Sequence, residues 1–393
     1  MDPVRNPFAP GAGSQPPELA GRDNIIADAE TALQRALLGR HSRSQILLGL
    51  RGVGKTVLLN KIEAAAEEFG HVTSFIEAPE GQSLAELIVP RAQQVLRKLS
   101  AVENAKAKAF AASRALRAFA SAFRLELGEY GISVDPEPGV ADSGNLEYDL
   151  SDLFVRIGDA AKAARRGWTL LIDEIQYLKE LDYAALIVAM HKCNQKSLPV
   201  LLFGAGLPQV AALSGDAKSY AERLFSYPSV GPLDETAAAD AVRLPVVGEQ
   251  EEITSEAIGS IYRHTRGYPY FLQEWGYQAW NAADHSPIDA AHVEGASGAA
   301  LRRLDEGFFK VRFERLTPKE REYVMAMATL GPGPYKSSEV AQVLGLDVQS
   351  LGPRRASIIS KGMIYSPAHG DIAFTVPLFE DFLMRNRNRS AVA

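Results

Sequence analysis

The stretch from Ile46 to Val57 constrains the fold of this chain most, because it joins an apolar strand, a glycine-rich turn and the start of a helix. Four of its residues fill the pattern G-x-x-x-x-G-K-[S/T]: Gly49, Gly54, Lys55 and Thr56. Glycines allow successive backbone N–H groups to face one anion, and the following helix adds its positive N-terminal end. The sequence therefore predicts a loop that holds the phosphates of a nucleotide.

The residues of this loop have separate expected roles. Lys55 would place its ammonium group between the β- and γ-phosphates, and the Thr56 hydroxyl would hold a magnesium ion that bridges them. We expect the nucleotide to contact Gly49, Arg51, Gly52, Val53, Gly54, Lys55, Thr56 and Val57. The expected cofactors are ATP and Mg²⁺. No base-reading motif is visible, so GTP remains an alternative.

A second apolar strand, Trp168 to Ile172, ends in Asp173 and Glu174. Its unbroken apolar run is typical of a strand buried on both faces in a parallel sheet between helices. Ligands of such sheets bind at the carboxyl ends of the strands, which is where the two carboxylates lie. Asp173 is the predicted magnesium ligand, and Glu174 is predicted to orient and polarise the attacking water. Together with the phosphate loop, this strand predicts nucleotide hydrolysis.

Composition excludes several other classes of protein. The chain has 393 residues, of which 46% are hydrophobic and 23% charged, which is typical of a globular protein of two or three domains. No apolar run approaches the ~20 residues of a membrane helix, and residues 1–7 lack a signal-peptide core. We therefore expect a cytoplasmic protein without a membrane partner. Cys193 is the only cysteine, which excludes an internal disulfide and a cysteine-rich zinc site.

The order of these motifs resembles that of AAA+ ATPases, nearest the origin-recognition and archaeal-type ATPase branch. The resemblance covers residues 16–235, through a Gly21-Arg22 box, the phosphate loop, the Asp173-Glu174 strand and the segment 220–225. It implies that Arg22 contributes to nucleotide binding. It also implies that Arg223 supplies an arginine finger to a neighbouring subunit of a homo-oligomer, with a helix-end salt bridge as the alternative.

Two positions depart from that family. The strand predicted at 199–203 leads into Gly204-Ala-Gly206, where the family usually has a polar γ-phosphate sensor. Tyr270 stands in a lid helix where the family is expected to have arginine, and Arg266 is the nearby substitute. Slow turnover, or a switch that mainly holds nucleotide, follows as a serious alternative.

The resemblance gives an α/β fold, a P-loop NTPase parallel sheet with helices on both faces, followed by a helical lid and a winged helix-turn-helix domain. The predicted boundaries are an extended Pro/Gly-rich arm at 1–20, the ATPase domain at 21–235, the lid at 236–305 and the winged helix at 306–393. The ATPase domain carries a basic helical insertion at about 83–148. A short hairpin is predicted from 123–127 with 131–134, within this insertion.

Two basic segments are candidates for contacting double-stranded DNA. From Arg91 to Arg124 the chain has eight basic side chains and only one acidic one. From 308 to 393 it has twelve basic and eight acidic side chains, with Arg354, Arg355 and Lys361 on the expected recognition helix and His369 on the wing. Basic surfaces suit duplex DNA, but winged helices also contact proteins.

We interpret the sequence as an ATP-binding and ATP-hydrolysing switch that couples nucleotide state to the winged helix. The alternatives are a nucleotide-regulated DNA-binding protein, and a signalling or defence ATPase that acts on a protein partner.

Overall fold

The computed structural model describes residues 1–11, 18–126, 135–211, 221–368 and 370–392. The chain forms two compact units. One unit, here called the sheet unit, contains residues 22–49 and 55–230. The other, the helical unit, contains residues 1–21, 50–54 and 231–393. Among the described residues no helix is long and apolar enough to cross a membrane.

Five parallel strands form the centre of the sheet unit. They are β1 (Ser44–Leu48), β2 (His71–Glu77), β3 (Gly167–Asp173), β4 (Val200–Gly206) and β5 (Phe225–Ser226), in the order β2-β3-β4-β1-β5. Every residue of β3 and β4 is buried, because helices cover both faces of the sheet. This order brings the ends of β1 and β3 to the same edge, on either side of β4. The predicted α/β fold with a parallel sheet is confirmed.

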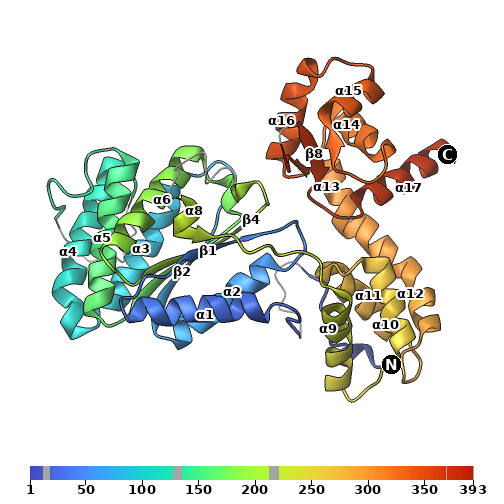
Figure 1. The fold of residues 1–393 in the computed structure, drawn as a ribbon, viewed down its shortest axis with the longest axis horizontal. Helices are drawn as coiled ribbons and strands as arrows, with labels where there is room; N and C mark the ends of the chain where they lie inside the picture. Colours follow the sequence, from blue (N-terminus) through green and yellow to red (C-terminus); the bar gives the residue numbers. More distant parts are fainter. Residues whose placement is uncertain (12–17, 127–134, 212–220, 369, 393) are drawn as a thin grey trace. The chain divides into compact units, whose positions relative to one another are not determined.

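Helices pack on both faces of this sheet (Figure 1). The helices on one face are α1 (Asp23–Leu37) and α2 (Lys55–Glu68), and those on the other are α3 (Leu84–Ser100), α5 (Leu146–Ala163) and α6 (Glu180–Gln195). A further helix, α4 (Lys106–Ala122), packs on α3 and α5. The pattern Ser83-Leu-Ala-Glu86 predicts a capping box at the start of α3, and the structure has it: Ser83 Oγ accepts a hydrogen bond from the Glu86 amide, and the Glu86 carboxylate accepts one from the Ser83 amide.

Two local predictions in the sheet unit differ from the structure. The strand predicted to end at Phe203 continues to Gly206, because β1 runs on beside it and pairs with Gly204, Ala205 and Gly206. The predicted hairpin falls mostly on residues 127–134, which lie outside the described residues, and 123–126 form a turn at the end of α4 rather than a strand. The Phe123 ring packs on Phe119 instead, at a centroid distance of 4.7 Å.

The helical unit begins with the helices predicted for the lid. They are α9 (Glu235–Gly248), α10 (Ser255–Thr265), α11 (Pro269–Ala282) and α12 (Ala290–Arg303). The sequence analysis placed the boundary between the lid and the winged helix at 305/306. The backbone stays helical across this point, as a π-helix over Leu304–Lys310 and then as α13 (Val311–Glu314). No break in the backbone therefore separates the lid helices from the residues that follow.

The C-terminal part of the helical unit combines short helices with a small sheet. The helices are α14 (Pro318–Thr329), α15 (Ser337–Leu344), α16 (Gly352–Ser360) and α17 (Phe379–Val392). The strands are β6 (Tyr335–Lys336), β7 (Ile364–Tyr365) and β8 (Asp371–Phe374), in the antiparallel order β6-β8-β7. The sequence pattern predicts helices at 321–329, 337–345 and 350–361 and strands at 364–366 and 371–376, and the structure has them as α14, α15, α16, β7 and β8. Strand β6 and helix α17 were not predicted.

Aromatic side chains join the lid helices to α17. Phe309, in the π-helical run, lies 6.1 Å from Phe271 of α11 and 5.2 Å from Phe382 of α17, measured between ring centroids. Arg385 of α17 also forms an ion pair with Asp305 at 2.6 Å. All three rings are almost fully buried. The helical unit therefore has one hydrophobic core, which spans the predicted lid and the predicted winged helix.

The N-terminal arm is anchored to this core. Its predicted extended character is interrupted by one 3₁₀ turn, Pro3–Arg5, and Phe8 is buried against α11. Gly276 of α11 makes room for the ring, because a Cβ there would come within 2.6 Å of Phe8 Cε1. The Trp280 indole also donates to the Asp2 carbonyl at 2.8 Å. The arm has no core of its own, but it contributes Phe8 to that of the helical unit.

Candidate active site

The phosphate loop lies between the end of β1 and the start of α2, as predicted. Gly52 and Gly54 have φ values of +82° and +92°, which residues with a side chain rarely adopt, so the backbone requires glycine at these two positions. Lys55 is only 7% exposed, and its Nζ donates to the Gly49 carbonyl at 2.9 Å. The ammonium group is thus folded back over its own loop.

Thr56 and Asp173, the two predicted magnesium ligands, are in direct contact. Thr56 Oγ1 donates to Asp173 Oδ2 at 2.5 Å, although 117 residues separate them along the chain. Helix α2 positions the hydroxyl and the end of β3 positions the carboxylate. Oxygen ligands of this type suit Mg²⁺, so the residues present fit the expected ion.

Burial raises the pKa of the Asp173 carboxyl above its ordinary value, because it penalises the charged form. Hydrogen bonds from the Thr56 hydroxyl and the Glu174 amide, and the charge of Lys55, act in the opposite direction. A cation bound to these oxygens would stabilise the charged carboxylate and so offset the effect of burial on its pKa.

Glu174 occupies an unusual backbone position directly after β3. Its φ is +53°, in the left-handed region, and its side chain is half-buried. The Gln176 side-chain amide donates to the Glu174 carboxylate, and Gln176 Oε1 accepts the Leu207 amide at 3.1 Å. Gln176 therefore ties the predicted water-activating group to the residue that follows β4.

Gln176 is the site residue that the sequence analysis missed. It stands two positions after Glu174, in Asp173-Glu-Ile-Gln176, and the pattern drew attention only to the acidic pair. At the end of β4 a Cβ on Gly206 would come within 2.8 Å of Gln176 Oε1. Gly204 and Gly206 carry no side chain at the end of β4, and the Gln176 side chain lies there instead.

The other residues predicted to contact nucleotide have varied surroundings. Arg22 is buried where α1 begins, and Val53 is buried in the loop. Arg51 and Gly52 are grouped with the helical unit, where the Arg51 amide donates to the Thr375 carbonyl at 3.1 Å and Gly52 accepts the Tyr270 amide at 3.2 Å. Val57 is half-buried in the first turn of α2.

Arg223 lies on a short helix, α8 (Ala221–Leu224), and its side chain is exposed. Helix α8 directly follows residues 212–220, which lie outside the described residues. The predicted role of Arg223 as an arginine finger in a neighbouring subunit stays a prediction.

The two lid residues named in the sequence analysis are engaged within the helical unit. The Tyr270 ring stacks on Phe308 at a centroid distance of 4.6 Å. Arg266 is 65% exposed and pairs loosely with Asp381 at 3.8 Å.

Comparison with known protein families indicates an ATPase domain, in agreement with the phosphate loop and the carboxylates of β3. Residues 18–203 match the AAA ATPase domain family, and residues 306–383 match a domain of unknown function, DUF8462. No curated protein is similar to the chain in sequence.

Among solved structures, the Walker-type ATPase PABY2304 of Pyrococcus abyssi has a TM-score of 0.56 and 16% identity, covering 93% of this chain and 96% of its own. This likeness shows the fold. The Aeropyrum pernix Orc1 protein in complex with DNA has a TM-score of 0.47 and 16% identity, covering 99% and 98% of the two chains. The Thermotoga maritima RuvB Holliday junction branch migration motor has a TM-score of 0.45 and 17% identity, covering 91% of this chain and 95% of its own. Both of these scores are too low to argue from.

Proposed function

Because residues 18–203 match the AAA ATPase domain family, we propose that this chain is an ATP-driven switch, in which the sheet unit binds and hydrolyses ATP and the helical unit responds. The observation that carries the proposal is the 2.5 Å contact between Thr56 and Asp173. It supports a magnesium site beside Lys55, with Glu174 at the next position along the chain.

The chemistry follows from the placement of these side chains. A bound magnesium ion would supply positive charge to the phosphate oxygens as negative charge develops on them. Lys55, freed from the Gly49 carbonyl, would reach the phosphates. Glu174 would accept a proton from the attacking water, and Gln176 would hold the carboxylate in place for it. The backbone amides of the loop complete the phosphate cradle.

Turnover is expected to be slow. Gly204 and Gly206 present no polar side chain at the end of β4, and Tyr270 replaces the arginine that the family resemblance leads us to expect in the lid. Fewer positioned charges around the γ-phosphate mean less stabilisation of the charge that develops in the transition state. A long-lived ATP state suits a switch better than a motor.

The helical unit is proposed as the output of this switch. Its segment 306–393 has three short helices, α14 to α16, followed by the β7–β8 hairpin, an order that supports a winged helix-turn-helix domain. The common core of lid and winged helix supports movement of both as one body.

We expect the distance between the two units to depend on the bound nucleotide. Cysteines introduced at Ala107 in α4 and Ala356 in α16, both exposed, would carry a donor and an acceptor dye. Cys193 would not react, because it is fully buried and burial raises the pKa of its thiol. Transfer efficiency should differ between ADP and a slowly hydrolysed ATP analogue.

The matched control is the same labelled pair with Lys55→Ala, which should need much higher concentrations of either nucleotide to give the same response. An identical transfer efficiency with ADP, with the ATP analogue and without nucleotide, in a protein shown to bind both, would reject coupling between the units.

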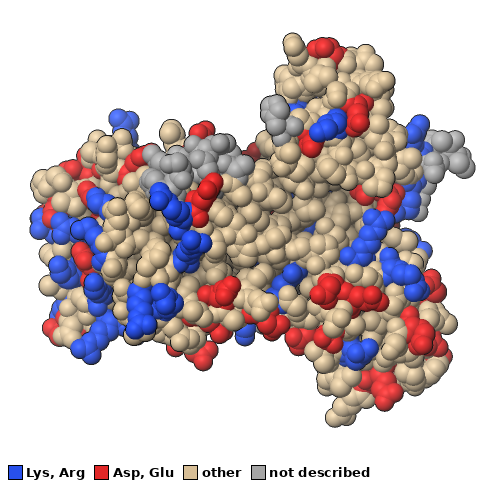
Figure 2. Space-filling view, in the orientation of Figure 1, with Lys and Arg blue, Asp and Glu red and all other residues tan. Residues whose placement is uncertain are grey.

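A second candidate function is binding of duplex DNA, and the α3–α4 surface favours it. We use this name for the basic side chains from Arg91 to Arg124, of which all but the half-buried Arg114 are exposed. Figure 2 shows basic side chains gathered over the part of the molecule that contains these helices. Such a surface would attract phosphates without reading sequence.

Arg355 of α16, and Lys361 directly after this helix, are less available for contacts with DNA, because both bind other groups of the protein. Arg355 donates to Ser337 Oγ at 2.9 Å, and Lys361 pairs with the buried Glu320 at 2.6 Å. Burial disfavours the charged form of Glu320, but hydrogen bonds from Lys361, Ser357 and Thr317 outweigh it and lower the pKa to about 2. Lys361 is thus committed to a buried carboxylate. His369 lies outside the described residues.

If DNA is the partner, we expect Arg97→Glu with Arg117→Glu to weaken duplex binding more than Arg354→Ala with Arg355→Ala. Each lost phosphate contact should also flatten the salt dependence by about one counterion. Fluorescence anisotropy of a labelled duplex across a salt series measures both effects. Wild-type protein that binds no duplex at low salt would instead favour a protein partner, as in a signalling or defence switch.

A further inference from the structure

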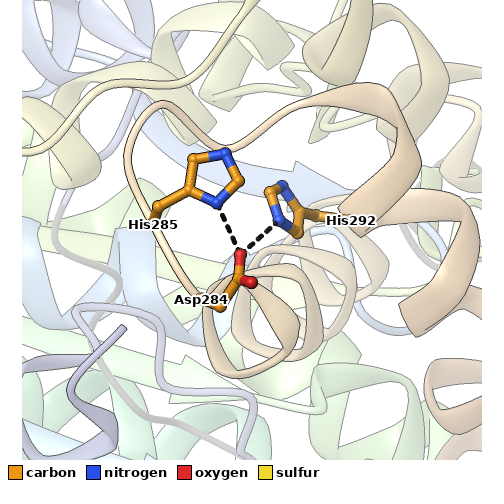
Figure 3. Close-up of side chains that lie close together, drawn as sticks. All are labelled: Asp284, His285 and His292. Atoms are coloured by element: carbon orange, nitrogen blue, oxygen red, sulfur yellow. Dashed lines mark hydrogen bonds and ion pairs between the residues drawn. The ribbon is translucent and has the colours of Figure 1, made fainter.

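Three side chains with metal-binding atoms converge in the helical unit, where α11 is joined to α12 (Figure 3). Asp284 and His285 lie in the connecting loop, and His292 lies in the first turn of α12. Their ligand atoms are all within 4.8 Å of one another. Asp284 Oδ1 is 2.5 Å from His285 Nδ1 and 3.2 Å from His292 Nε2. Both imidazoles are therefore directed at one carboxylate oxygen.

The backbone around this cluster is fixed by its own hydrogen bonds. The Ile288 amide donates to the Glu252 carbonyl at 2.8 Å, and the Thr254 amide donates to the Ile288 carbonyl at 2.9 Å. The Glu252 amide also donates to Ser286 Oγ at 3.0 Å. The loop that carries Asp284 and His285 is thus held against the segment before α10, while α12 fixes His292. Ligands held in this way lose little freedom when they bind an ion.

A fourth residue, Asp289, supports His292 from behind. Its Oδ1 lies 3.0 Å from His292 Nδ1, the ring nitrogen on the side away from Asp284. The Asp289 backbone amide also donates to His292 Nδ1 at 3.2 Å, so the ring is held by the capping box of α12. Binding of an ion at Nε2 would place the ring proton on Nδ1, where Asp289 Oδ1 can accept it. Histidines that bind metals usually have such a partner.

We propose that Asp284, His285 and His292 form a binding site for a divalent transition-metal ion of the zinc type, with Asp289 orienting His292. Two imidazole nitrogens and one carboxylate oxygen suit Zn²⁺, whereas Mg²⁺ and Ca²⁺ prefer oxygen ligands alone. Tetrahedral zinc with bonds of about 2.0–2.1 Å places its ligand atoms roughly 3.3 Å apart. Asp284 is 83% and His285 63% exposed at the side chain, so small rotations reach that spacing.

The site is separate from the one at Thr56 and Asp173, and it needs no nucleotide. Water would complete the coordination, because three protein ligands leave a fourth tetrahedral position open. A bound ion would link the α11–α12 loop to the start of α12. The sequence analysis did not identify this cluster, because the spacing of seven residues between His285 and His292 matches no common zinc motif.

Isothermal titration of Zn²⁺ into chelator-treated protein without a histidine tag tests the proposal. Wild-type protein should bind one Zn²⁺, and His285→Ala should weaken binding at least tenfold with an unchanged circular dichroism spectrum, since that side chain is exposed. Asp289→Asn keeps a good helix N-cap but removes the carboxylate charge, so it should weaken binding about 10–100-fold. His41→Ala, an exposed histidine outside the cluster, is the matched control.

Co²⁺ added to the same proteins provides a second readout. Wild-type protein should give the visible absorption bands of a low-coordinate Co²⁺ site, and these bands should be absent from His285→Ala. Absence of one-to-one Zn²⁺ binding by wild-type protein, or equal affinity in wild-type and His285→Ala, would overturn the proposal.

Discussion

Replacing Lys55 by alanine is expected to lower ATP affinity by about 10- to 150-fold while the chain stays folded. The lost contact is a charge-assisted hydrogen bond to phosphate, which contributes about 1.5–3 kcal/mol. Lys55 is buried by its own loop rather than by the hydrophobic core, so truncation removes a ligand-binding group without opening the core. Isothermal titration measures the affinity, and circular dichroism reports the fold.

Lys61→Ala is the matched control for this variant, because Lys61 lies on the same helix, α2, but is exposed. Its ATP affinity should equal that of wild-type protein. Undiminished ATP binding by Lys55→Ala would mean that the loop is not the phosphate site.

Replacing Glu174 by glutamine is expected to retain ATP binding and to reduce turnover by about 10²–10⁴-fold. An amide has nearly the size of the carboxylate and can still form hydrogen bonds, but it cannot accept the proton of the attacking water. The hydrogen bond from Gln176 can be retained through the remaining carbonyl oxygen. Release of phosphate under steady-state conditions, together with ATP affinity, separates the two effects.

The control for this second variant is Glu180→Gln, which changes an exposed carboxylate at the start of α6. It should hydrolyse ATP at the wild-type rate. Turnover that survives in Glu174→Gln would assign water activation to another residue.

The phosphate loop and the acidic strand end were predictable because each depends on local chemistry. Gly52 and Gly54 are required by positive φ. An apolar strand that ends in two carboxylates is common by itself, but paired with the phosphate loop it indicates nucleotide hydrolysis. The long-range contact between Thr56 and Asp173 followed only from the rule that parallel strands present their carboxyl ends at one edge. That rule gave the neighbourhood of the two residues but not the hydrogen bond.

The features that escaped prediction depend on contacts between distant segments. Phe8 has no local partner, so a Pro-rich arm gave no sign that it would enter a core beside Gly276. Gln176 has an ordinary sequence context, and its role comes from the fold that brings Leu207 beside it. The extension of β4 through Gly206 was set by its neighbour β1, which outweighed the low strand preference of glycine.

The position of α17 limits how the molecule can be dissected. Phe379 and Phe382 supply part of the packing around Phe309, so a fragment ending before residue 379 would expose rings that are almost fully buried in the intact chain. A fragment that begins at α14 would lose Phe309 and Asp305 and leave the same core open from the other side. Recombinant fragments designed at the predicted 305/306 boundary would therefore tend to aggregate. A useful excision of the C-terminal part has to keep residues 231–393 together and to retain the N-terminal arm, whose Phe8 belongs to the same core.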